Sequence, residues 1–157
     1  MTSITLTDNI TKIDTSAFYN CTSLRTINIP RNVSQIDSSA FSGCNLESIT
    51  VDTNNTTYDS RNNCNAIIKT SNNSLIKGCN TTIIPNDIAS IGGSAFIGCD
   101  NLINVTLPDS VTSIGYNSFA ECKNLENITL GSGITSIAGS TFRDCPKLTS
   151  IIFPESI

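Results

Sequence analysis

The chain has 157 residues, of which 38% are hydrophobic and only 14% are charged, and its formal net charge is −4. A chain of this length can bury a hydrophobic core, so its size does not require a metal or disulfides. The nine basic residues are scattered, which argues against nucleic acid or an acidic membrane surface as a partner. No apolar stretch approaches the roughly 20 residues that span a bilayer, so we expect no membrane insertion.

The strongest pattern in the sequence is a repeat with a period of 23 residues. When the copies are aligned, valine or isoleucine, phenylalanine and cysteine each recur at equivalent positions, which form columns of the alignment. The aromatic and thiol columns consist of Phe18, Phe41, Phe96, Phe119 and Phe142, and of Cys21, Cys44, Cys99, Cys122 and Cys145. A period of this length is typical of a solenoid, in which each copy is one supersecondary unit that buries its apolar face against its neighbours.

Each copy begins with a predicted strand. Leu24, Ile27 and Ile29 alternate with polar residues, which indicates a strand with one buried face. Pro30 follows directly and ends the strand, and prolines occupy the same place at positions 85, 108 and 154. We expect roughly seven such strands to stack in parallel.

The return path of each copy is predicted to be irregular. A VxxI pattern follows the strand, and residues 37–44 then begin with Asp37, Ser38 and Ser39, which are good N-cap residues. Gly43 follows soon after, so this segment predicts one short helical turn. The fold class is therefore a leucine-rich-repeat solenoid, with a parallel β-sheet on the concave face and short helical turns and irregular segments on the convex face.

In chain order, residues 1–157 form a single domain of about six repeats and a final strand. The units span 4–26, 27–48, 49–81, 82–104, 105–127 and 128–150, with the last strand at 151–154. The third unit is about ten residues too long, and its apolar pairs Ile67-Ile68 and Leu75-Ile76 flank a polar turn. It predicts a β-hairpin folded out of the coil, and such insertions often carry what distinguishes one solenoid from another.

The recurring IxIP, VxxI and AFxGC segments resemble the BspA-like leucine-rich repeats, a family of surface proteins in anaerobic bacteria and parasitic protists. The insert, with YDSRNNCNAIIKT and SLIKGC, is similar to a variant unit of that family. The resemblance implies a cell-surface or secreted protein that adheres to a protein or glycan ligand on a host or bacterial surface. The chain shows no export signal, no anchor and no capping unit, so we expect a fragment of a longer array that self-associates through its uncapped ends.

Catalytic and metal chemistry have little support in the sequence. The chain contains no histidine, which removes the commonest general base and the usual zinc ligand. No CxxC occurs, and the five cysteines in register are expected to be buried thiols. Cys64 and Cys79 flank the strands of the insert, and they predict either a disulfide or two further core thiols. We expect no enzyme activity, no cofactor and no metal site.

The outward side chains of the strands are the candidate binding residues. Alternation places Ile27 and Ile29 inward and Thr26 and Asn28 outward. The candidate set on the concave face is Thr5, Thr26, Asn28, Ser48, Thr50, Asn104, Thr106, Asn127 and Thr129. Arg25, Glu47, Lys123 and Glu126 flank this face and add charge at one rim. The alternative is that threonine and asparagine simply make a soluble, strand-compatible surface.

Three functions are compatible with this pattern. The first is a non-catalytic module that binds a protein or a glycan, because a row of small donors and acceptors without a deep pocket suits an extended surface. The second is a structural spacer that holds another domain away from the cell wall. The third is a binder of ice or carbohydrate surfaces through regular threonine columns.

Overall fold

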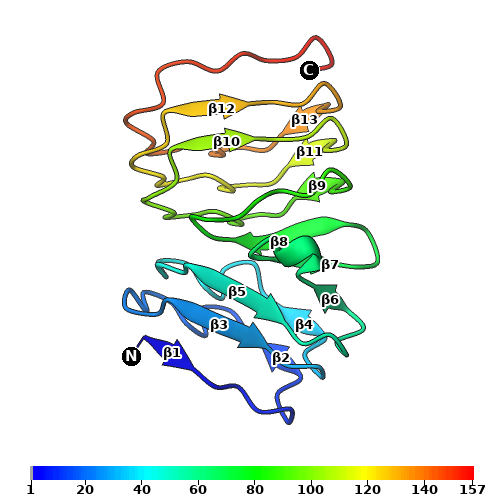
Figure 1. Cartoon of the computed structure of the whole chain (residues 1–157). Helices are drawn as coiled ribbons and strands as arrows, with labels where there is room; N and C mark the ends of the chain where they lie inside the picture. Colours follow the sequence, from blue (N-terminus) through cyan, green and yellow to red (C-terminus); the bar gives the residue numbers. More distant parts are fainter. Residues whose placement is uncertain (1) are drawn as a thin grey trace.

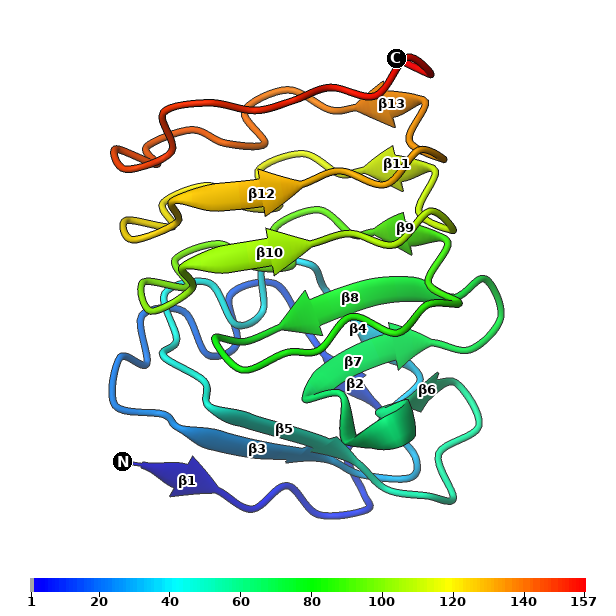
Figure 2. The same ribbon diagram turned by 45° about the horizontal axis from the view of Figure 1, so that its top comes forward.

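The computed structural model describes residues 2–157, which wind into a stack of β coils with the two termini at opposite ends (Figure 1). Successive coils lie one above the next, so that residues 23 apart pair directly, as Asn104 does with Asn127. Each regular coil contributes a strand to one side of the stack and a shorter strand to another side (Figure 2). The solenoid predicted from the period is therefore confirmed.

The longer strands form what we term the strand face. Their alternation is the cause: in β3 the isoleucines are buried, whereas Thr26 and Asn28 are exposed. One sheet contains β1 (Ser3–Ile4), β3 (Thr26–Ile29) and β5 (Ser48–Val51), all parallel. A second contains β10 (Asn104–Thr106) and β12 (Asn127–Thr129), and an isolated parallel bridge joins Thr129 to Ile152.

A second column of two-residue strands runs along the stack. Each strand ends on an isoleucine of the VxxI pattern and begins on a polar residue, so one residue of each points inward. β2 (Lys12–Ile13) pairs with β4 (Gln35–Ile36), and β9 (Ser90–Ile91), β11 (Ser113–Ile114) and β13 (Ser136–Ile137) pair in succession. From the sequence, this stretch is predicted only as part of the irregular return path.

The insert occupies the middle of the stack. It contains β6 (Tyr58–Asp59), the 3-10 helix η1 (Arg61–Asn63), β7 (Ala66–Lys69) and β8 (Ser74–Gly78). These three strands are antiparallel, and β8 also pairs in parallel with β9, which gives a six-stranded sheet. The expectation that the hairpin folds out of the coil is wrong. The pair Ile67-Ile68 is buried on both sides of β7, with Ile67 in one core cluster and Ile68 in the other.

The core contains two ladders of stacked aromatic rings. The ring centroids of Phe18 and Phe41 are 5.2 Å apart, those of Phe96 and Phe119 are 5.0 Å apart, and those of Phe119 and Phe142 are 5.9 Å apart. The insert separates Phe41 from Phe96. The in-register stacking predicted from the period is confirmed within each ladder.

Residues 37–44 fold as consecutive turns. Ala40 N donates to Asp37 O at 3.1 Å, and Ser42 N donates to Ser39 O at 3.1 Å. Asp37 caps the turn, since its Oδ1 accepts from Ser39 N at 2.9 Å. These three-residue closures correspond to the expected helical turn, although η1 is the only assigned helix in residues 2–157. Within the same residues, no helix is long and apolar enough to cross a membrane.

Candidate functional site

The nine candidate binding residues lie on or beside the strand face. Ser48 is partly buried, and the other eight side chains are exposed. The structure therefore places them where alternation predicted, with the aliphatic residues between them buried. Whether this surface binds a ligand remains a prediction.

Hydrogen bonds connect some of these side chains between neighbouring coils. Thr50 Oγ1 donates to Asn28 Oδ1 at 2.9 Å. Asn127 Nδ2 donates to Asn104 Oδ1 at the same distance. Pairs directly opposite each other on parallel strands fall within hydrogen-bonding reach because adjacent strands are about 4.8 Å apart. The polar groups thus form short, ordered rows.

The strand face is divided into two patches, which we name by their position in the chain. The N-terminal patch consists of Thr5, Thr26, Asn28, Ser48 and Thr50, and the C-terminal patch consists of Asn104, Thr106, Asn127 and Thr129. Between them, residues 82–86, termed the bridging segment, form no strand. The expectation of seven stacked parallel strands is therefore wrong at this coil. The break also shortens the threonine columns that a binder of ice would require.

A single threonine explains why the bridging segment is not a strand. Thr82 occupies the position held by Val105 one coil later, but its hydroxyl is bonded to the insert. Thr82 Oγ1 donates to Asn65 O at 2.6 Å and accepts from Cys79 N at 2.8 Å. Ile83 N donates to Cys64 O at 3.1 Å. The backbone here is tied to the insert instead of to the next coil.

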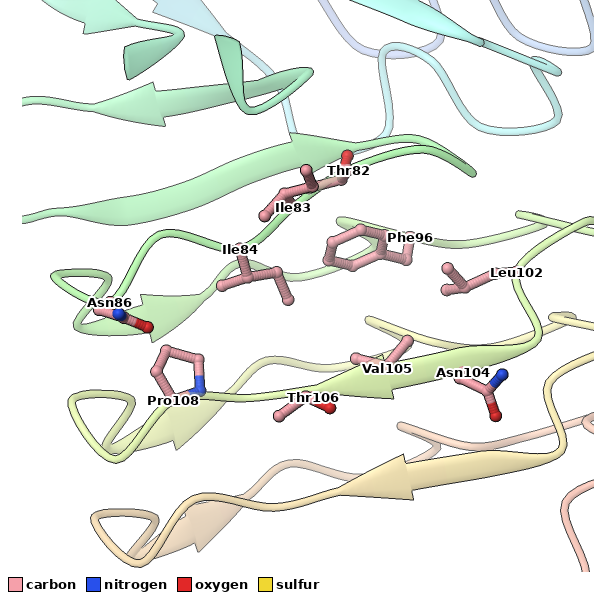
Figure 3. Close-up of a pocket in the computed structure, with 10 residues that line it drawn as sticks. All are labelled: Thr82, Ile83, Ile84, Asn86, Phe96, Leu102, Asn104, Val105, Thr106 and Pro108. Carbon is pink, nitrogen blue, oxygen red and sulfur yellow. The ribbon is translucent and has the colours of Figure 1, made fainter. Parts of the chain in front are cut away.

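A cavity of about 320 Å³ lies between the bridging segment and β10 (Figure 3). Its lining includes Ile84 from the bridging segment and the buried side chains of Phe96, Leu102 and Val105. Ile83, on its rim, is 75% exposed. The cavity was not predicted from the sequence, although the replacement of the usual aliphatic residue by Thr82 is a signal that could have indicated it.

The flanking charges form ion pairs between coils. Arg25 Nε lies 3.3 Å from Glu47 Oε1, and Lys123 Nζ lies 3.0 Å from Asp100 Oδ2. These side chains are substantially exposed, so such pairs contribute little to stability. The hydrogen bond with Asp100 raises the pKa of Lys123. The rim charges predicted from the sequence are therefore largely neutralised by neighbours.

One ion-pair cluster ties the insert to the following coil. Arg61 Nη2 lies 2.8 Å from Asp59 Oδ2, and Arg61 Nη1 lies 2.6 Å from Asp87 Oδ2. Arg61 Nη1 also donates to Asn73 Oδ1 at 3.1 Å. Hydrogen bonds with Asp59, and then with Asp87, raise the pKa of Arg61. The bonds of this arginine fix the insert beside the turn that carries Asp87.

The cysteines are free thiols, including Cys64 and Cys79, for which the sequence left a disulfide open. Burial raises the pKa of the Cys99 thiol to about 11 and also raises the pKa of Cys122. Thiols with raised pKa values are poor nucleophiles and poor metal ligands at neutral pH. Among residues 2–157, no group of three histidine, cysteine or acidic side chains is arranged to hold a metal.

Comparison with known proteins identifies the repeat. A family model described as a BspA type leucine rich repeat region, in six copies, matches residues 1–79 and 70–157. No curated protein matches the chain.

Solved bacterial structures share the fold. A leucine rich cell surface protein from Faecalibacterium prausnitzii is 36% identical to this chain with a TM-score of 0.82. The match covers 98% of this chain and 41% of that protein's chain. The pneumococcal vaccine antigen PcpA is 20% identical with a TM-score of 0.62, covering 71% of this chain and 28% of its own. A leucine-rich repeat protein from Eubacterium ventriosum is 20% identical with a TM-score of 0.53, covering 94% of this chain and 59% of its own.

Proposed function

Because the chain belongs to the BspA-type leucine-rich-repeat family, we propose that it is a non-catalytic segment of a cell-surface protein that binds a protein or a glycan through its strand face. The structure from Faecalibacterium prausnitzii, described as a cell surface protein, supports the location because it is 36% identical over 98% of this chain. This chain spans 41% of the length of that relative, so any activity of the whole protein belongs to the proposal as well.

The observation that carries the proposal is the C-terminal patch. Its two amides and two hydroxyls are exposed, and they lie in rows on a parallel pair of strands in register. The Asn104–Asn127 bond uses one amide donor and one acceptor, and the four side chains of the patch are exposed. Fixed, uncharged donors and acceptors at strand spacing suit the hydroxyl groups of a glycan or the polar surface of a protein.

The proposal is tested by a pair of opposite charges placed in the C-terminal patch. The double variant Thr106→Lys with Asn127→Glu keeps the net charge of the chain and removes one member of each row. We expect binding to a glycan array and to immobilised extracellular proteins to fall to background, because bulky charged groups would block the contact surface. The midpoint of thermal unfolding should stay nearly unchanged, since both positions are exposed.

The matched control carries the same two charges on the second strand column. Thr112, directly before β11, and Ser136, in β13, are exposed and belong to neighbouring coils, so Thr112→Lys with Ser136→Glu should retain all binding. If the patch variant binds the same targets as the unchanged chain, or if the control loses binding equally, the strand face is not the contact surface.

The structural spacer is the second candidate, and the side-chain bonds between coils favour it. A threonine or asparagine that bonds its counterpart one coil away also contributes to stacking without any ligand. A spacer would show no retained target in the unchanged chain, and the patch variant would alter only unfolding. The two functions are separated by the same experiment.

A further inference from the structure

β10 has a strand partner on one side only. It pairs with β12, whereas β3 in the N-terminal sheet has a strand on each side. In residues 2–157, no hydrogen bond joins the backbone of the bridging segment to that of β10. The bridging segment belongs to the coil that precedes β10. Its backbone N–H groups at Thr82 and Ile83 donate to the insert and not to β10.

The orientation of the free backbone groups follows from the bonds on the paired side. Ile103 O accepts from Asn127 N, and Leu107 N donates to Thr129 O, so these two residues face β12. Backbone groups of alternate residues in a strand point to opposite sides. The N–H and C=O groups of Asn104 and Thr106 therefore face the bridging segment, where no strand receives them.

A groove runs along this unpaired edge, and we term it the edge groove. The 320 Å³ cavity above Phe96 forms one part, and a second hollow shares Asn86, Thr106 and Pro108 with it and continues toward Gly131. The residues that line the cavity carry no formal charge. The floor is apolar and one wall presents a row of backbone donors and acceptors, which is the combination that an extended peptide recognises.

We propose that the edge groove binds an extended, uncharged peptide segment of a partner protein, which adds to β10 as a further strand. The partner backbone pairs with the N–H and C=O groups of Asn104 and Thr106. One aliphatic side chain enters the cavity and rests on Phe96 and Ile84, while its two neighbours point to solvent. This assignment deepens the proposed function, because it names a class of protein ligand and places it at the border of the C-terminal patch.

The test begins with a displayed library of random heptapeptides selected against the unchanged chain. We expect enriched peptides with one aliphatic residue between polar residues. Synthetic peptides methylated at the backbone nitrogens on one set of alternate residues should lose binding, and those methylated on the other set should keep it. A strand added at an edge uses only one set of its amides. This arm of the test needs no altered protein.

Two substitutions at one position distinguish the groove from the side-chain rows. Thr106→Pro deletes the N–H that faces the groove and leaves the bonds to β12, because proline is tolerated at an edge strand when the lost donor faces solvent. The Kd of an enriched peptide should rise about two- to tenfold, as expected for the loss of one net backbone hydrogen bond. Thr106→Val retains the backbone N–H and should bind the peptide as the unchanged chain does.

The same pair separates failure of this inference from failure of the proposed function. Loss of peptide binding in Thr106→Pro but not in Thr106→Val supports the strand addition, and loss of target binding in the variant Thr106→Lys with Asn127→Glu supports the proposed function independently. The strand addition is overturned if no peptide is enriched, if methylation of either set has the same effect, or if Thr106→Pro binds normally. Concentration-dependent dimers of the free chain that Thr106→Pro abolishes would show a second copy as the occupant, and would also overturn it.

Discussion

Replacement of Lys77 by methionine should stabilise the protein. Lys77 lies on β8 opposite Ile67 and is 3% exposed, and its Nζ has no hydrogen-bond partner in the described residues. A buried polar group without a partner costs about 1–3 kcal/mol, and more when it is charged. Methionine has a similar length and no polar hydrogen, and a swap that conserves volume costs less than about 1.5 kcal/mol. We therefore expect Lys77→Met to raise the free energy of unfolding by about 1–2 kcal/mol.

Urea unfolding followed by circular dichroism measures this change, since the chain contains no tryptophan. For a chain of this size, the expected gain corresponds to a rise in Tm of roughly 2–8 °C. Lys123→Met serves as the control, because the Lys123 side chain is 66% exposed and its removal should change stability by less than about 0.5 kcal/mol.

The opposite outcome would assign a role to the Lys77 amino group. If Lys77→Met lowers the free energy of unfolding by more than about 1 kcal/mol while Lys123→Met is neutral, the amino group stabilises the core, and the unpartnered-group argument is refuted.

Two further predictions concern the core. Phe119→Ala should lower the free energy of unfolding by about 3–5 kcal/mol, and Phe18→Ala by roughly half as much, because Phe119 is buried between two rings and Phe18 stacks on one at the end of its ladder. Equal losses in urea unfolding would contradict the ladder. The Cys99 pKa of about 11, against 9.0 for a free thiol, makes the folded state keep a proton that the unfolded chain loses. This contribution to stability is present below pH 9 and is lost as the pH rises toward 11, at about 1.4 kcal/mol per pH unit. Cys99→Ala should remove that share of the pH dependence, and an unchanged slope would show that the thiol ionises equally in both states.

The regular coils could be predicted from the sequence because the same local pattern recurs at a fixed period. Identical positions in successive copies face identical neighbours, so the spacing from Phe96 to Phe119 to Phe142 is sufficient to predict a stacked column. The exposure of Asn104 and Thr106 follows from alternation alone. Both arguments rest on near-neighbour geometry, which a repeat sequence encodes directly.

The insert could be predicted only in part. Its length and its two apolar pairs indicated an antiparallel hairpin, but they did not show where the hairpin packs. The consecutive residues Ala66, Ile67 and Ile68 are a signal for this packing, because an unbroken apolar run indicates a strand covered on both faces. The burial of Lys77 follows from contacts with distant coils and has no counterpart in the local pattern.

The open edge of β10 has its origin in the same insert. A regular coil would place an aliphatic residue at position 82 and pair its strand with β10, as β12 does on the other side. Thr82 instead bonds to Asn65 and Cys79, so the coil nearest the insert gives up one strand. The two phenylalanine ladders are each complete without the other, since they end at Phe41 and begin at Phe96 on either side of this boundary. A peptide bound in the edge groove would therefore pair with a strand edge that the repeat leaves open beside the insert.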